Sequence, residues 1–171
     1  AYSRTQCVSR PAAGVLSKPE PALILGGLDR IREDGVPAGD DPGIEDVHHF
    51  VESRLVHLVG EVGYKLHTGR SRNEQIATDL RLFLRDHIDR LHAQLGDLVT
   101  TIVDQADAAG PAVMPAYTHL QRAEPVLVAH WWLAYAEMLF RDADRLQSCR
   151  TRLNECPLGA GAVAGTFLPL D

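Results

Sequence analysis

Apolar residues recur at steps of three and four along several stretches of the chain, which predicts helices rather than strands. The most regular stretch runs from residue 72 to residue 109, where no proline intervenes and only Gly96 is a weak helix former. Its apolar positions form a near-heptad stripe: Ala77, Leu80, Leu84, Ile88, Leu91, Leu95, Leu98 and Ile102. A helix of this length is about 50 Å long, whereas a domain of 171 residues is expected to be only about 30 to 35 Å across. We therefore expect this helix to extend past its own domain and to pack on other helices, including helices of other chains.

The same spacing predicts shorter helices on both sides of the long one, separated by loops rich in glycine and proline. The predicted helices cover residues 1–10, 19–34, 45–59 and 125–156. The predicted loops cover residues 35–43, 60–71, 115–124 and 157–169. No stretch of useful length alternates like a strand, except briefly near Val126, inside a helical context. The chain is therefore predicted to be all-α, with two long antiparallel helices.

Charge and cysteine content narrow the class of protein. The net charge of −6 argues against a general binder of nucleic acid or of membrane surfaces, since such proteins are usually basic. No apolar run reaches membrane-spanning length. The three cysteines lack a metal-type spacing, and this cysteine content fits a reducing cytoplasm. The chain starts without methionine and stops without an end signal, so we expect it to be part of a longer protein.

The loop before the long helix concentrates basic and polar side chains. Its members are Lys65, His67, Thr68, Arg70, Ser71, Arg72 and Asn73. A helix N-terminus offers unpaired N–H groups and a partial positive charge, so guanidinium groups beside it can form a site for carboxylate or phosphate. The alternative is a plain helix cap by Ser71 or Asn73 with solvated arginines, and spacing alone favours this alternative.

A second loop, between residues 114 and 124, also precedes a predicted helix and carries His119 between Thr118 and Gln121. A histidine in such a loop can act as an acid or a base near neutral pH. The alternative is a structural histidine that bonds to the backbone, and the loop taken alone favours this alternative as well.

A third group of acids and histidines lies at helical spacing between Glu45 and Glu52. Glu45-x-x-His48 is a spacing found in carboxylate-bridged metal bundles, but those sites need a second such motif and two further glutamates. Because the chain has only one Glu-x-x-His, we expect a locally paired or solvated helix face rather than a metal site.

Four segments together resemble the argininosuccinate lyases. Residues 67–73 read His-Thr-Gly-Arg-Ser-Arg-Asn, and residues 114–125 read Met-Pro-x-Tyr-Thr-His-Leu-Gln-Arg-Ala-x-Pro, and each matches a signature of that family. Residues 157–162 and residues 45–48 resemble two more family segments. The four occur in the family's order across most of the chain, and such a set is very hard to obtain by chance.

The resemblance implies a fold, an assembly and an activity. Argininosuccinate lyases are similar to fumarases and aspartases, which are helical homotetramers with a central bundle of long helices and active sites built from three subunits. By this resemblance, residues 1–64 are part of the N-terminal helical domain and residues 65–171 begin the central bundle. The implied activity is cleavage of argininosuccinate to arginine and fumarate in arginine biosynthesis, in the cytoplasm. It implies no metal or organic cofactor and no nucleic-acid or membrane partner.

By the same resemblance, His119 is the catalytic histidine. The residues implied to contact the substrate are Ser71, Arg72, Asn73 and Thr118. Glu74 departs from the family, which usually has aspartate at this position, and the family's catalytic serine loop is absent from the chain. Two alternatives stay open: a non-catalytic structural relative of the crystallin type, and a sibling lyase that acts on another succinyl substrate.

Overall fold

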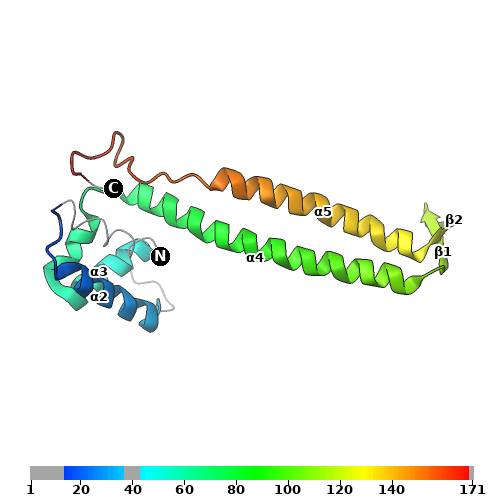
Figure 1. Cartoon of the computed structure of the whole chain (residues 1–171), viewed down its shortest axis with the longest axis horizontal. Helices are drawn as coiled ribbons and strands as arrows, with labels where there is room; N and C mark the ends of the chain where they lie inside the picture. Colours follow the sequence, from blue (N-terminus) through cyan, green and yellow to red (C-terminus); the bar gives the residue numbers. More distant parts are fainter. Residues whose placement is uncertain (1–13, 37–42, 170–171) are drawn as a thin grey trace. The chain divides into compact units, whose positions relative to one another are not determined.

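The computed structural model describes residues 14–36 and 43–169. The helix predicted for residues 1–10 and most of the loop predicted for residues 35–43 lie outside the described residues. The elements, in chain order, are α2 (Glu20–Asp34), α3 (Val47–Val59), the 3-10 helix η1 (Gly60–His67), α4 (Arg72–Ala109), β1 (Val113–Thr118), β2 (Gln121–Leu127) and α5 (Val128–Leu153) (Figure 1). The predicted all-α class is confirmed, and the long helix has the predicted bounds. Among the described residues, none of the helices is both long enough and apolar enough to cross a membrane.

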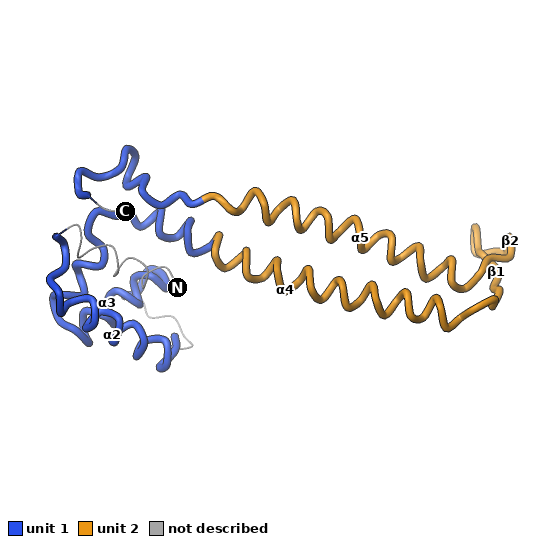
Figure 2. Tube along the Cα trace, in the orientation of Figure 1, with its two compact units in different colours: residues 1–80, 156–171 blue, residues 81–155 orange. Residues whose placement is uncertain are grey.

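The chain divides into two compact units (Figure 2). The first unit contains residues 1–80 and 156–171, and the second contains residues 81–155.

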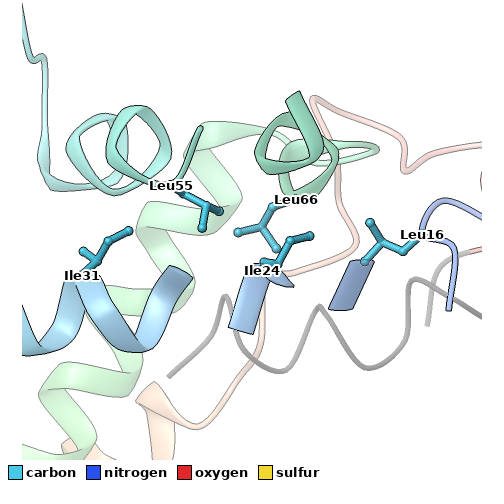
Figure 3. Close-up of a cluster of buried hydrophobic side chains, with 5 residues drawn as sticks. All are labelled: Leu16, Ile24, Ile31, Leu55 and Leu66. Atoms are coloured by element: carbon cyan, nitrogen blue, oxygen red, sulfur yellow. The ribbon is translucent and has the colours of Figure 1, made fainter. Parts of the chain in front are cut away.

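The core of the first unit lies between α2, α3 and η1. Its buried apolar side chains are Leu16, Ile24, Ile31, Leu55 and Leu66 (Figure 3). Gly27 allows α2 and α3 to approach closely, because a Cβ there would lie only 2.7 Å from Leu55 Cδ1 and 2.9 Å from Val59 Cγ1. Lys65 Nζ donates a hydrogen bond of 2.6 Å to Glu20 Oε1, which ties η1 to the start of α2.

The segment from Gly60 to His67 is a 3-10 helix, so the prediction of a plain loop there was wrong. The physical reason is tertiary packing rather than local preference. Gly63 and Leu66 are buried, and a Cβ on Gly63 would lie 3.0 Å from the Val56 backbone. The close contact between η1 and α3 therefore imposes a tight turn that the sequence pattern does not reveal.

In the second unit, the later part of α4 and the whole of α5 run antiparallel, joined by the β1–β2 hairpin (Figure 1). Their shared seam consists of the buried Val99, Ile102 and Ala136, with Trp132 and Leu139 packed against them. Further along, the Arg150 guanidinium donates two hydrogen bonds, of 2.7 and 3.2 Å, to the Asp89 carboxylate. This pairing lowers the pKa of Asp89 and raises the pKa of Arg150.

The predicted apolar stripe of α4 is only partly buried. Ile88 and Ile102 are buried, whereas Leu91 and Leu98 are each 46% exposed. Helix α5 exposes a comparable set of large apolar side chains: Trp131, Leu133, Tyr135, Met138 and Phe140. Two helices bury only the seam between them, so this much exposed apolar surface is available for packing against further helices.

Candidate active site

The loop before α4 ends in a helix cap. Ser71 precedes the first residue of α4, and its Oγ accepts a hydrogen bond of 3.3 Å from the Asn73 N–H. In return, the Ser71 N–H donates to Glu74 Oε1 at 3.0 Å. Ser71 and Glu74 thus form a capping box, which satisfies N–H groups that the first turn of a helix leaves without partners. Ser71 therefore caps α4, which is one of the roles predicted for it. Asn73 is exposed.

Arg72 is held by two neighbours. Its Nη1 donates a hydrogen bond of 2.9 Å to Gln75 Oε1, and its Nη2 is hydrogen-bonded and ion-paired to Glu52 Oε2. His67 Nδ1 lies 3.8 Å from the same Glu52 oxygen. The guanidinium is therefore fixed in place by α3 and by its own helix, and it is not a solvated surface group.

An open cleft of about 460 Å³ lies beside this arginine. Its lining residues are Glu45, His49, Glu52, Ser53, Val56, Tyr64 and Arg72. The cleft is bounded by α3, η1 and the first residue of α4, and it is polar on the side of Arg72 and Glu52. A small charged molecule would find one cation and two carboxylates there.

The acids and histidines between Glu45 and Glu52 are paired locally, as expected. Asp46 caps α3 by accepting a hydrogen bond of 2.7 Å from the His49 N–H. His48 Nδ1 lies 3.4 Å from the Asp79 carboxylate, and His49 Nδ1 accepts a hydrogen bond of 3.2 Å from the Glu45 N–H. The contact between His48 and Asp79 joins α3 to α4, whereas the other two contacts lie within the start of α3.

Glu74, where the family usually has aspartate, makes contacts that were not predicted from the sequence. Its side chain is buried, and its Oε2 accepts hydrogen bonds from the N–H groups of Gly159, at 2.9 Å, and Gly161, at 2.8 Å. A segment 85 positions further along the chain is thereby attached to the first turn of α4. The Ser71-x-x-Glu74 spacing could have revealed the capping box, but no local signal predicts the distant glycine partners.

The second predicted loop contains a β-hairpin. Residues 113–118 and 121–127 form an antiparallel hairpin, so the prediction of a loop at residues 115–124 was wrong, and α5 begins at Val128 rather than at Pro125. Strand β2 carries Pro125 opposite Pro115 of β1, in a two-stranded sheet where both strands are edges. Edge strands tolerate proline because no further strand needs its missing N–H. The prolines concealed these strands, and the brief alternation near Val126 was assigned to a helical context.

His119 and Leu120 form the tip of this hairpin. Thr118 pairs with Gln121, which leaves a two-residue turn. Both turn residues have positive φ, 51° for His119 and 62° for Leu120. Two-residue hairpin turns of this kind favour asparagine and glycine, and a leucine in the left-handed region is costly. Such a strained conformation is often kept at a functional site.

The predicted site residues fall into two groups. Ser71, Arg72 and Asn73 come together at the start of α4, in the first unit. Thr118 and His119 come together at the hairpin tip, in the second unit, and both are exposed.

The described fold is helical and presents two polar segments, and comparison with known proteins shows the family to which it belongs. A family model described as "Lyase" matches residues 5–171. The chain belongs to this lyase family.

Curated relatives of high identity are argininosuccinate lyases. The chain is 61% identical over 171 residues to the argininosuccinate lyase of Koribacter versatilis (strain Ellin345), covering 100% of this chain and 37% of that protein. It is 56% identical over 165 residues to the argininosuccinate lyase of Thermus thermophilus, covering 94% of this chain and 36% of that protein. The chain therefore spans little more than a third of the length of these relatives.

Solved structures of similar fold include an EDDS lyase variant with bound fumarate. It shares 34% sequence identity with this chain, with a TM-score of 0.82, and the match covers 99% of this chain and 33% of that one. A fumarate lyase:delta crystallin from Brucella melitensis bound to cobalt has a TM-score of 0.76 at 16% identity, over 96% of this chain and 41% of that one. The second likeness shows the fold alone.

Proposed function

We propose that this chain is the front portion of an argininosuccinate lyase, which cleaves argininosuccinate into arginine and fumarate in the cytoplasm. The observation that carries the proposal is the high identity to argininosuccinate lyases along the whole chain. The bound fumarate in the similar EDDS lyase variant supports a product of the same kind. In the longer enzyme, residues 1–64 would belong to the N-terminal domain and residues 65–171 would begin the central helix bundle.

The proposed reaction is an elimination. A base removes the proton on the carbon next to a carboxylate, the C–N bond breaks, and an acid supplies a proton to the departing guanidino nitrogen. Extra negative charge develops on that carboxylate, so fixed cationic and amide donors are needed to stabilise it. We assign this task to Arg72 and Asn73, with Ser71 and Thr118 as further substrate contacts. His119 is the proposed acid–base residue.

We propose that active sites are shared between copies in a homotetramer. The lyase family that this chain resembles builds each active site from several subunits, so Asn73 at the start of α4 and His119 after its end would serve sites that are shared between copies. The exposed apolar side chains of α4 and α5 support packing against helices of other copies.

The proposal is tested by measuring fumarate formation from argininosuccinate by the full-length enzyme and its His119→Asn variant. Asparagine keeps some hydrogen bonding but cannot exchange a proton at neutral pH, so turnover should fall by about two to four powers of ten. The matched control is His92→Asn, since His92 is an exposed histidine on α4, and this variant should keep normal turnover. An unchanged rate for His119→Asn would remove His119 from the mechanism. A wild-type enzyme that converts another succinyl compound but not argininosuccinate would overturn the proposed substrate.

A further inference from the structure

A buried carboxylate joins two distant segments of the first unit. The Glu74 side chain belongs to a residue that is only 5% exposed, and its two oxygens accept three backbone hydrogen bonds. Oε1 accepts from Ser71 within the first turn of α4. Oε2 accepts from Gly159 and Gly161. A buried charge is costly without partners, so these donors stabilise the carboxylate. The carboxylate in turn satisfies the three N–H groups.

The glycine segment is shaped to present its N–H groups to this carboxylate. Gly159 and Gly161 have φ of +100° and +58°, which other residues rarely adopt. A Cβ on Gly161 would lie 2.7 Å from the Gly165 carbonyl oxygen, so glycine is required there by space as well. The Gly165 N–H in turn donates to the Ala160 carbonyl at 2.7 Å, which closes the segment into a compact turn.

We propose that Glu74 is a positioning residue: its carboxylate attaches the glycine turn at residues 159–165 to the start of α4 and so fixes the direction of Arg72 and Asn73. This inference rests on the proposed function, in which those two residues contact the substrate. Glu74 acts through the main chain and does not touch the substrate. The role differs from simple capping, because a cap alone needs only the Ser71 contact.

Substitutions of Glu74 can test this proposal, because both carboxylate oxygens act as acceptors. Both oxygens of Glu74 face N–H donors, so a glutamine at this position would point its NH₂ group at one of them whichever way the amide is oriented. An aspartate keeps both acceptors and the charge, one methylene shorter. Glu74→Gln should therefore break the attachment, and Glu74→Asp should largely preserve it.

The matched control is Thr78→Val. The Thr78 hydroxyl is buried and donates to the Glu74 carbonyl at 2.7 Å, so valine removes a hydrogen bond in the same turn but leaves the carboxylate contacts intact. This variant shows how a general weakening of the first turn of α4 affects amide exchange and enzyme kinetics. All three variants are made in the full-length enzyme.

The first readout is hydrogen exchange, measured by mass spectrometry on the peptide that contains Gly159 and Gly161. In Glu74→Gln, these amides should exchange about tenfold or more faster, because they lose their acceptor. Glu74→Asp and Thr78→Val should stay near the wild-type rate. Unchanged exchange in Glu74→Gln would overturn the attachment itself.

The second readout separates positioning from stability. Glu74→Gln should lower kcat about tenfold, with a smaller change in the KM for argininosuccinate, because misdirected Arg72 and Asn73 stabilise the charge that develops in the transition state less well. Glu74→Asp should restore kcat, and Thr78→Val should leave it unchanged even if the melting temperature falls. Faster exchange with a wild-type kcat would overturn the positioning role. If the wild-type enzyme does not act on argininosuccinate, the proposed function fails, while the exchange result still decides the attachment.

Discussion

Leu120 occupies a position that suits leucine poorly. Its side chain is 99% exposed, and its backbone has a φ of 62°. A left-handed conformation costs an L residue about 1 to 2 kcal/mol, and glycine escapes this cost while losing more entropy on folding. Leu120→Gly should therefore increase the free energy of unfolding by about 0.5 to 1 kcal/mol, measured by urea denaturation. Leu120→Ala is the control, because alanine removes the side chain but keeps the strain. An equal effect of both variants would show that the side chain matters rather than the backbone.

A substitution of Asn73 tests the proposed substrate contact separately from the cap of α4. Its side chain is exposed, and the cap of α4 is made by Ser71 and Glu74. In the full-length enzyme, Asn73→Ala should lose transition-state stabilisation of about 2 to 4 kcal/mol in kcat/KM, as expected for one donor to a developing charge. Circular dichroism should show an unchanged helix content. Asn154→Ala, at an exposed asparagine after α5, is the control. Normal kcat/KM for Asn73→Ala would leave this loop with its capping role only.

At the scale of elements, Asp46 makes the stability of α3 depend on pH. Burial alone would raise the pKa of Asp46, but the hydrogen bond from the His49 N–H and the charges of His48 and Arg72 together hold it below its ordinary value of 3.8. A carboxyl whose pKa is lowered by folding stabilises the protein above its unfolded pKa, and this stabilisation is lost as the pH falls through the folded pKa. Losing the cap should cost about 1 kcal/mol at neutral pH.

The corresponding measurement compares Asp46→Ala with the wild type across pH. The difference in free energy of unfolding should be full at neutral pH and should shrink as the pH falls below 3.8. Asp46→Asn caps without titrating, so its advantage over alanine should persist in acid. A wild-type advantage that stays constant at low pH would exclude the carboxylate as its source.

The hydrophobic pattern of the sequence predicts some of the elements and misses others. The bounds of α4 follow from an unbroken apolar period between a polar loop and the Gly110-Pro111 break, so local sequence suffices there. The hairpin escaped prediction because its strands contain Pro115 and Pro125 and bury almost nothing in the described chain, so they carry only a brief alternation near Val126. The site residues were predicted from motif resemblance. The partners of Glu74 were not, because contacts across 85 and 87 positions leave no local trace.

At the scale of the whole molecule, the apolar surface of α4 and α5 exceeds what the two helices bury between them. Leu91 and Leu98 on α4 are each 46% exposed, and Phe140 on α5 is 55% exposed. Apolar surface of this extent is usually covered by a partner. The 171-residue chain should therefore self-associate at micromolar concentration, and sedimentation that shows a well-folded monomer would contradict the proposed packing.

Leu91→Asp in the full-length enzyme tests where the subunits meet. In an isolated chain the new charge would remain hydrated, because Leu91 is half exposed, so the fold should survive. In an assembled bundle the same charge would be buried without a partner, which costs several kcal/mol and should shift the tetramer toward smaller species in analytical ultracentrifugation. Thr100→Asp is the matched control, since a residue nine positions away lies on the opposite side of the helix and Thr100 is exposed. This variant carries the same charge and should leave assembly unchanged. A tetramer that tolerates Leu91→Asp as well as it tolerates Thr100→Asp would place the interface on another side of α4.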